Sequence, residues 1–298
     1  MSARKFKYFT CDVFTERRFG GNPLAVLTDA RGLTGEQMQQ IARDFNFSET
    51  TFVLPPDDSR HTARVRIFTP VHEMKFAGHP TVGTAFVLAT TGAVAREIAD
   101  IVLEENVGPV PVHIDRDGSR VTRCTLTAAQ LPQQLPAAPD RAALAAMLSL
   151  DAADVLDGAE GWSCGTPFLV VPVNGLRALA RCSPDGAPIL RTLADYPTKA
   201  VYPVTREAAD VWHVRCFVPH LGVVEDPATG SAAAAFAGWL AARAPQGDGT
   251  LRMRLNQGIE MGRPSELALE IDRTAGRVTA VRVGGASIMV NKGLIEVD

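Results

Sequence analysis

Two alanine- and glycine-rich segments most constrain how this 298-residue chain can fold. Residues 82–88 (VGTAFVL) are small or apolar around the whole circumference that a helix would present, and so is most of 225–244 (EDPATGSAAAAFAGWLAARA). A helix without a polar face is normally buried on all sides. Each half of the chain therefore predicts one helix that is enclosed by other elements.

The remaining segments are mostly strand-like. Residues 7–16 are β-rich, residues 60–70 alternate polar and apolar, and the stretch from residue 251 to the end is strand-rich with glycine turns. The order of elements repeats loosely after the proline-rich stretch 131–140, which we interpret as a linker. We therefore expect an α+β fold of two pseudo-symmetric domains, 1–130 and 131–298, each a sheet around a buried helix.

One further helix can be predicted with both its ends. Thr34 and Gln37 have the spacing of a capping box, and Leu33 with Met38 that of a hydrophobic staple. Asn46 is a reasonable C-terminal stop. We expect a helix between these limits.

Charge and cysteine content exclude several classes of function. The net charge of −3 comes without a basic stripe, so nucleic acid is not expected as a partner. Five scattered cysteines without CxxC pairs indicate neither a disulfide framework nor a zinc site, and no metal site is predicted. No segment has the ~20 apolar residues that a membrane span needs. We expect no membrane association and a cytoplasmic location.

Both predicted buried helices begin with polar clusters that suit an acidic ligand. One reads Ala-Gly-His-Pro-Thr over 77–81, and the other Glu-Asp-Pro-Ala-Thr-Gly-Ser over 225–231. A helix N-terminus carries unpaired N–H groups and a positive dipole end, which favour a carboxylate. The alternative is that Asp226, Thr229 and Ser231 only cap the helix and that His79 is an ordinary turn residue. These residues alone leave both interpretations open.

Glu49 lies between the helix 34–46 and a strand, in the sequence Asn-Phe-Ser-Glu-Thr-Thr. Its neighbours Phe47 and Phe52 predict partial removal of the carboxylate from water, which would suit a general acid or base. The alternative is an exposed loop carboxylate without a chemical role. Local sequence leaves that alternative open too.

Several segments together resemble one family. These segments are DVFTERRFGGNPLAVL, FSETTFV, RIFTPVHEMKFAGHPTVGTAFVL, EDPATGSAAAAFAGWL and QGIEMGRPSEL, and they run in order from residue 12 to about 267. They resemble the successive signatures of the PhzF-like isomerases of phenazine biosynthesis. The resemblance implies a diaminopimelate epimerase-like fold, in which two domains with curved, mostly antiparallel sheets around a central helix flank a cleft. It also implies a homodimer, with neither metal nor organic cofactor.

The resemblance also assigns roles by motif position. It implies that Glu49 carries a proton between two carbons of a small carboxylated substrate, with Ser48 beside it. The family's histidine and aspartate correspond to His79 and Asp226. Binding residues correspond to Gly78, Gly230 and Ser231. The physiological substrate is left open.

Two other functions are compatible with the same segments. The related epimerases use two opposed thiols, but Ala77 and Pro227 occupy the matching positions here. Racemisation would therefore need other bases. A binding protein that keeps the cleft without turnover is the third alternative.

Overall fold

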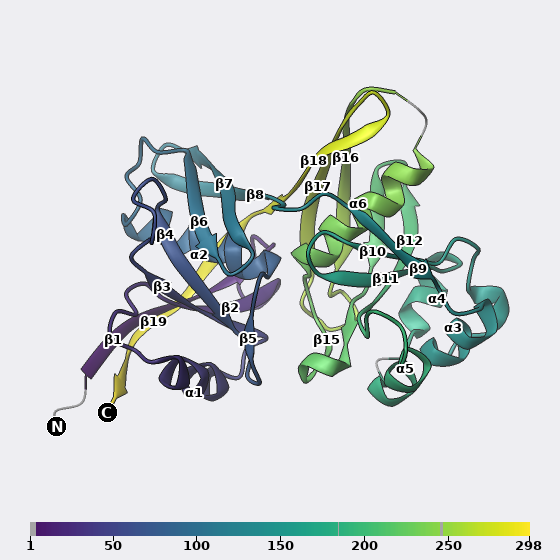
Figure 1. Ribbon diagram of the computed structural model, residues 1–298, viewed down its shortest axis with the longest axis horizontal. Coiled ribbons are helices and arrows are strands. Elements are labelled where there is room, and N and C mark those ends of the chain that lie inside the picture. The colour runs from purple at the N-terminus through teal and green to yellow at the C-terminus, as the bar shows by residue number, and fades with distance from the viewer. Residues whose placement is uncertain (1–3, 184, 245–246) are drawn as a thin grey trace. The chain divides into compact units, whose positions relative to one another are not determined.

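The computed structural model describes residues 4–183, 185–244 and 247–298. Within them, six α-helices and nineteen strands divide into two compact units. The first unit comprises Met1–Ala129 and Gly284–Asp298, and the second comprises Gln130–Val283. Figure 1 shows both, with most of their elements labelled. The mixed α+β prediction is confirmed.

The first unit contains two helices among its strands. Its elements are β1 (Arg4–Val13), β2 (Asn22–Leu27), α1 (Gly35–Phe45), β3 (Glu49–Leu54), β4 (Ala63–Phe68), β5 (Glu73–Met74), α2 (Gly78–Thr91), β6 (Asp100–Glu105), β7 (Gly108–Asp117), β8 (Arg120–Thr127) and β19 (Ser287–Val297).

Most strand pairs of the first unit are antiparallel. β1 pairs antiparallel with both β2 and β19, and β6–β7–β8 form an antiparallel meander. The pairs β2–β3 and β4–β6 are parallel. In each parallel pair the connection includes a helix, α1 in the first and α2 in the second.

The helix α1 begins and ends as predicted. The Thr34 side chain accepts from the backbone N–H of Gln37, and the Gln37 side chain accepts from the backbone N–H of Thr34. Asn46 ends the helix in the left-handed conformation with φ 52°. Leu33 and Met38 lie in one buried apolar cluster, which attaches α1 to the sheet.

The helix α2 is buried from Gly78 to Ala89, as its composition predicts. It contacts β1, β2, β3, β7, β8 and β19. Close approach to the sheet requires glycine at one position, because a Cβ on Gly83 would lie 2.6 Å from side-chain carbons of Val13 and Leu24. The helix α2 is therefore packed closely against the sheet.

The second unit has the same general plan with more helices. Its elements are β9 (Gln133–Ala137), α3 (Arg141–Leu148), β10 (Glu160–Ser163), β11 (Pro167–Pro172), α4 (Gly175–Arg181), α5 (Gly186–Thr192), β12 (Val201–Ala208), β13 (Val211–Val214), β14 (Phe217–Val218), β15 (Val223–Glu225), α6 (Gly230–Arg243), β16 (Gly249–Gln257), β17 (Ser265–Thr274) and β18 (Arg277–Gly285), whose last two residues belong to the first unit.

The helix α6 is the enclosed helix of the second unit. It is buried from Gly230 to Leu240 and contacts β9, β10, β11 and β17. The Phe236 ring packs edge-on against Tyr202 and Trp212, with centroids 6.0 and 5.2 Å away. Both buried helices that the sequence predicts are thus present.

Two features differ from the predicted organisation. The proline-rich stretch 131–140 contains strand β9, which pairs antiparallel with β10 and is therefore part of a sheet. The last strand, β19, lies in the first unit rather than the second, because it pairs along its length with β1. Figure 1 shows these two strands, purple and yellow, running side by side. In the part of the chain that the structure describes, no helix has the length and apolar character to cross a membrane.

Candidate active site

Glu49 and His79 lie together in the first unit. Glu49 is the first residue of β3 and His79 the second of α2, and their side chains are 11% and 4% exposed. The atoms Glu49 Oε2 and His79 Nε2 are 3.3 Å apart. The structure therefore overturns the alternative of an exposed loop carboxylate.

Phe52, one of the two phenylalanines from which the sequence predicted the burial of Glu49, does not cover the carboxylate. Side chains alternate across a strand, so Glu49 shares a face of β3 with Thr51, whose hydroxyl lies 2.9 Å from that of Thr84 in α2. Phe52 points to the opposite face, into the cluster with α1. The helix α2 thus contacts the carboxylate through His79.

His79 is a neutral imidazole with a defined tautomer. Burial lowers the pKa of His79 to about 3, because the charged ring would lose its hydration. The Asn22 amide nitrogen lies 3.1 Å from His79 Nδ1. In this orientation of the Asn22 amide its nitrogen donates, so Nδ1 accepts and the ring proton is on Nε2, the atom that faces Glu49.

The 3.3 Å contact of Glu49 with His79 is therefore not an ion pair. The ring is uncharged, and the two atoms lack the alignment of a hydrogen bond. Among the described residues, the buried Nε2–H of His79 has no hydrogen-bond acceptor. A polar group in that position is expensive to leave unsatisfied, so it is suited to a ligand.

The N-terminus of α6 holds the second group of predicted residues. Asp226 and Ser231 are buried on either side of Thr229, and Gly230 begins the helix. The Thr229 hydroxyl donates to Asp226 Oδ2 at 2.5 Å, and the Thr229 side chain makes no capping bond to the helix. The capping interpretation of Thr229 is therefore wrong, since its hydroxyl donates to the Asp226 carboxylate and makes no bond to the helix backbone.

In neither buried helix does the side chain of the N-cap residue cap the first turn. Ala77 is the N-cap of α2 and Thr229 that of α6, and no side-chain capping bond is present at either. Gly78 and Gly230 are the first helical residues. Their backbone N–H groups lie at the positive ends of the helix dipoles, where an anion is stabilised.

Ser48 precedes Glu49 in a half-buried bend. The structure thus groups the predicted residues by unit: Ser48, Glu49, Gly78 and His79 in the first, and Asp226, Gly230 and Ser231 in the second.

Comparison with known proteins agrees with these features. A family model described as phenazine biosynthesis-like protein (PhzC-PhzF) matches residues 11–293. The chain belongs to the phenazine biosynthesis-like family. An uncharacterized isomerase of Mesorhizobium japonicum is 42% identical in an alignment that covers 96% of this chain and 97% of that protein.

Another relative of the chain bears the name of a defined reaction. The trans-2,3-dihydro-3-hydroxyanthranilate isomerase of Pseudomonas aeruginosa is 37% identical, covering 94% of this chain and 95% of that protein. A solved PhzF-family structure from Bacillus anthracis matches with a TM-score of 0.87 and 27% identity, covering 98% and 99% of the two chains. This phenazine biosynthesis-like protein is accordingly an enzyme, an isomerase.

Thiol chemistry has no support at either helix N-terminus of this family member. All five cysteines are buried, and burial raises the pKa of Cys124, Cys164 and Cys182 to about 12. A thiol that stays protonated at neutral pH is a poor base. Among the described residues, no group of three or more His, Cys, Asp or Glu side chains is arranged to hold a metal ion.

Sequence reasoning missed three buried polar residues beside these two groups. Asn22 fixes the tautomer of His79, Gln257 binds residues 226 and 229, and Glu105 bonds Thr81 in the first turn of α2. Asn22 and Gln257 each stand in a segment that carries the family resemblance, which was the available signal. Glu105 had none.

Glu105 is a neutral carboxylic acid. Its Oε1 lies 2.5 Å from the Thr81 hydroxyl, which is also 2.7 Å from the Ala77 carbonyl oxygen. The hydroxyl has one hydrogen and two neighbouring acceptors, so a proton on Glu105 satisfies both contacts. Burial raises the pKa of Glu105 to about 8, which agrees with this arrangement.

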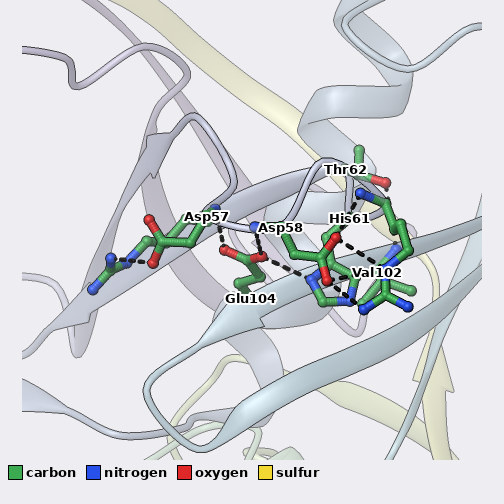
Figure 2. Close-up of polar contacts among 8 residues, drawn as sticks. Asp57, Asp58, His61, Thr62, Val102 and Glu104 are labelled. Carbon is green, nitrogen blue, oxygen red and sulfur yellow. Dashed lines mark hydrogen bonds and ion pairs between the residues drawn. The ribbon is translucent and has the colours of Figure 1, made fainter.

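The adjacent Glu104 is ionised and points the other way. Figure 2 shows it reaching the loop between β3 and β4, where it accepts from the backbone N–H groups of Asp57 and Asp58 at 2.7 and 2.8 Å. His61 Nδ1 lies 2.7 Å from the same carboxylate. These backbone hydrogen bonds lower the pKa of Glu104, so the residue anchors the loop as an anion.

Proposed function

We propose that this isomerase moves a proton between two carbons of a small carboxylated substrate, cyclic or open-chain, with Glu49 as the acid and base. The observation that carries the proposal is the buried Glu49 carboxylate 3.3 Å from a neutral His79. A partly desolvated carboxylate is a stronger base than one in water. The neighbouring N–H adds a donor without adding a competing positive charge.

The proposed reaction needs only one side chain to carry the proton. Glu49 removes a proton from a carbon beside the conjugated part of the substrate, and the C–H electron pair delocalises over that system. The protonated Glu49 carboxyl exchanges its proton with solvent and then delivers a proton to a different carbon. No atom or electron is gained or lost overall, so the proposal requires no cofactor.

The remaining predicted residues are proposed to bind the substrate and stabilise its charge. The Nε2–H of His79 is proposed to donate to the negative charge that develops in the transition state. Backbone N–H groups at Gly78 and Gly230, with the Ser231 hydroxyl, suit a substrate carboxylate. Ser48 is proposed as a further binding residue and Asp226 as the group that orients the substrate.

The partners and location remain predictions. The resemblance implies a homodimer, and the composition predicts a cytoplasmic enzyme without nucleic-acid or membrane partners. Trans-2,3-dihydro-3-hydroxyanthranilate is the reasonable first probe, because a relative that is 37% identical is named as the isomerase of this compound.

Deuterium incorporation tests the role of Glu49. The wild-type protein, incubated with this probe in D2O, should place deuterium on the carbon that receives the proton. We expect Glu49→Gln to fold normally and to lose at least about 10²-fold of this activity, since the amide cannot take up the proton. Glu97→Gln, an exposed change in the same unit, is the matched control. Undiminished deuterium incorporation in Glu49→Gln would refute the assigned role.

A further inference from the structure

Gln257 is a fully buried carboxamide at the end of β16. Its Nε2 donates to the Asp226 carbonyl oxygen at 2.8 Å and to the Thr229 hydroxyl oxygen at 2.9 Å. Its Oε1 accepts from the Thr229 backbone N–H at 3.2 Å. Three bonds thus tie one side chain to the loop that precedes α6.

The orientation of this amide follows from its partners. The opposite orientation would place Oε1 against the Asp226 carbonyl oxygen and the amide nitrogen against the Thr229 N–H. Both contacts would be repulsive. In the orientation present, the Thr229 oxygen accepts from Gln257 while its hydrogen goes to Asp226 Oδ2 at 2.5 Å. The bonds run in one direction, from Gln257 through Thr229 to the Asp226 carboxylate.

The backbone beside Gln257 holds it close to the loop. Gly258 has a φ of +73°, and a Cβ there would lie 2.6 Å from the Pro227 carbonyl oxygen and 2.5 Å from that of Arg263. Only glycine fits such an approach. Gln257 itself is paired with Ser265 in the sheet, so the carboxamide is presented from a rigid strand.

We propose that Gln257 is a positioning residue, which holds the Asp226 carboxylate in one orientation at the N-terminus of α6 by way of the Thr229 hydroxyl. This inference rests on the proposed function, in which Asp226 orients the substrate. Gln257 does not need to touch the substrate. Its effect comes from limiting the orientations of Asp226, and misplacement by ~1 Å can cost about 10²-fold in rate.

Steady-state kinetics with trans-2,3-dihydro-3-hydroxyanthranilate test the positioning role. Gln257→Glu puts a carboxylate oxygen against the Asp226 carbonyl, so we expect kcat to fall about 10²-fold at pH 8 while KM changes less. Part of kcat should return at lower pH, as the introduced carboxyl gains a proton that it can donate. Gln133→Glu, an exposed change in the same unit, should behave as wild type. Loss of fold alone would lower the active fraction at every pH and leave the profile unchanged.

A pair of variants at Thr229 tests the same relay independently. Thr229→Ser keeps the hydroxyl and should retain most of kcat. Thr229→Val removes it and should match the loss in Gln257→Glu. No capping bond is lost in either variant, because the Thr229 side chain makes none. Equal activity of the two variants would overturn the relay.

The outcomes separate this inference from the proposed function. Loss of activity in Glu49→Gln together with a wild-type kcat and pH profile in Gln257→Glu overturns the positioning role alone. Full activity in Glu49→Gln refutes the proposed function instead. Amide hydrogen exchange at Thr229 then still decides whether Gln257 holds the loop. In Gln257→Leu the Thr229 N–H loses its acceptor and should exchange at least about tenfold faster, and unchanged protection overturns the inference.

Discussion

At the scale of the residue, two consecutive glutamates differ in protonation, one being ionised and the other neutral. Glu104 and Glu105 are consecutive in β6, and strand alternation sends them to opposite faces. Backbone N–H donors keep Glu104 ionised, whereas burial raises the pKa of Glu105 and keeps it protonated at neutral pH. The environment of each carboxyl, and not its sequence neighbours, decides its charge.

The tautomer of His79 can be changed through Asn22. In Asn22→Asp the new side chain can only accept, so the ring proton should move to Nδ1 and leave Nε2 bare towards Glu49. The Nε2–H donor of the proposed mechanism would be lost, and deuterium incorporation should fall about 10²- to 10⁴-fold. ¹⁵N NMR of the imidazole nitrogens reports the tautomer directly. The exposed His113 is an internal reference whose signals should not change. Retention of the proton on Nε2 would contradict the assignment.

Glu105 should give the stability of the protein a specific pH dependence. Its pKa is about 8 in the folded chain and 4.5 in its ordinary state, so the native state binds the extra proton between these values. The free energy of unfolding therefore falls as pH rises from about 4.5 to about 8 and then levels off. Glu105→Gln imitates the protonated acid and should remove this slope. The difference between variant and wild type should grow to the order of a few kcal/mol at pH 8.

Urea unfolding at pH 5, 6, 7 and 8 measures this difference. Glu97→Gln, on the surface of the same unit, is the control for removal of one charge. A constant difference between Glu105→Gln and wild type across this range would show that Glu105 is ionised in the native state.

At the scale of the element, both buried helices present their N-termini in the same way. The N-cap residue of each makes no side-chain capping bond, and each is approached by a buried carboxamide from a strand, Asn22 at α2 and Gln257 at α6. The Asn22 amide contacts His79 directly. The Gln257 amide is linked to the Asp226 carboxylate through the Thr229 hydroxyl. A carboxamide suits this purpose because it donates and accepts without carrying a charge.

The loop between β3 and β4 depends on Glu104 in a testable way. The lowered pKa means that the stabilising contribution of Glu104 is present above about pH 4.5, the ordinary value, and is lost as pH falls through the folded value. Glu104→Gln removes one of the two accepting oxygens. The amides of Asp57 and Asp58 should then exchange faster with solvent at neutral pH. Deuterium-exchange mass spectrometry of this loop checks the effect, and unchanged protection would mean that the loop is held by other contacts.

The sequence predicts those features that depend on local pattern. The caps of α1, the enclosed helices and the grouping of residues at their N-termini all follow from composition and spacing. Contacts between distant residues do not, because Asn22 bonds a residue 57 positions away and Gln257 residues 28 and 31 positions away. The stretch 131–140 shows that a local pattern can also predict the wrong structure. Its prolines indicate a linker, yet pairing with β10 makes five of its residues a strand.

At the scale of the whole molecule, the first unit is completed by the end of the chain. β19 pairs with β1 from Arg4–Val297 to Val13–Ser287, so the first and last strands are neighbours in one sheet. Ile295 packs against the apolar cluster beneath α1. The first unit cannot be complete until the last residues are available, and folding of that unit therefore requires contacts of very high sequence separation.

A matched pair of substitutions in β19 measures how much this closing strand contributes. Ile295 is half-buried against the α1 cluster, whereas its neighbour Leu294 is 62% exposed. Ile295→Ala should lower the free energy of unfolding by about 1–2 kcal/mol, because it removes packed methylene groups from the cluster. Leu294→Ala should stay within about 0.5 kcal/mol of wild type. Urea unfolding monitored by circular dichroism compares the two. Equal losses would mean that β19 stabilises the unit through its backbone pairing and not through the side chain that reaches the core.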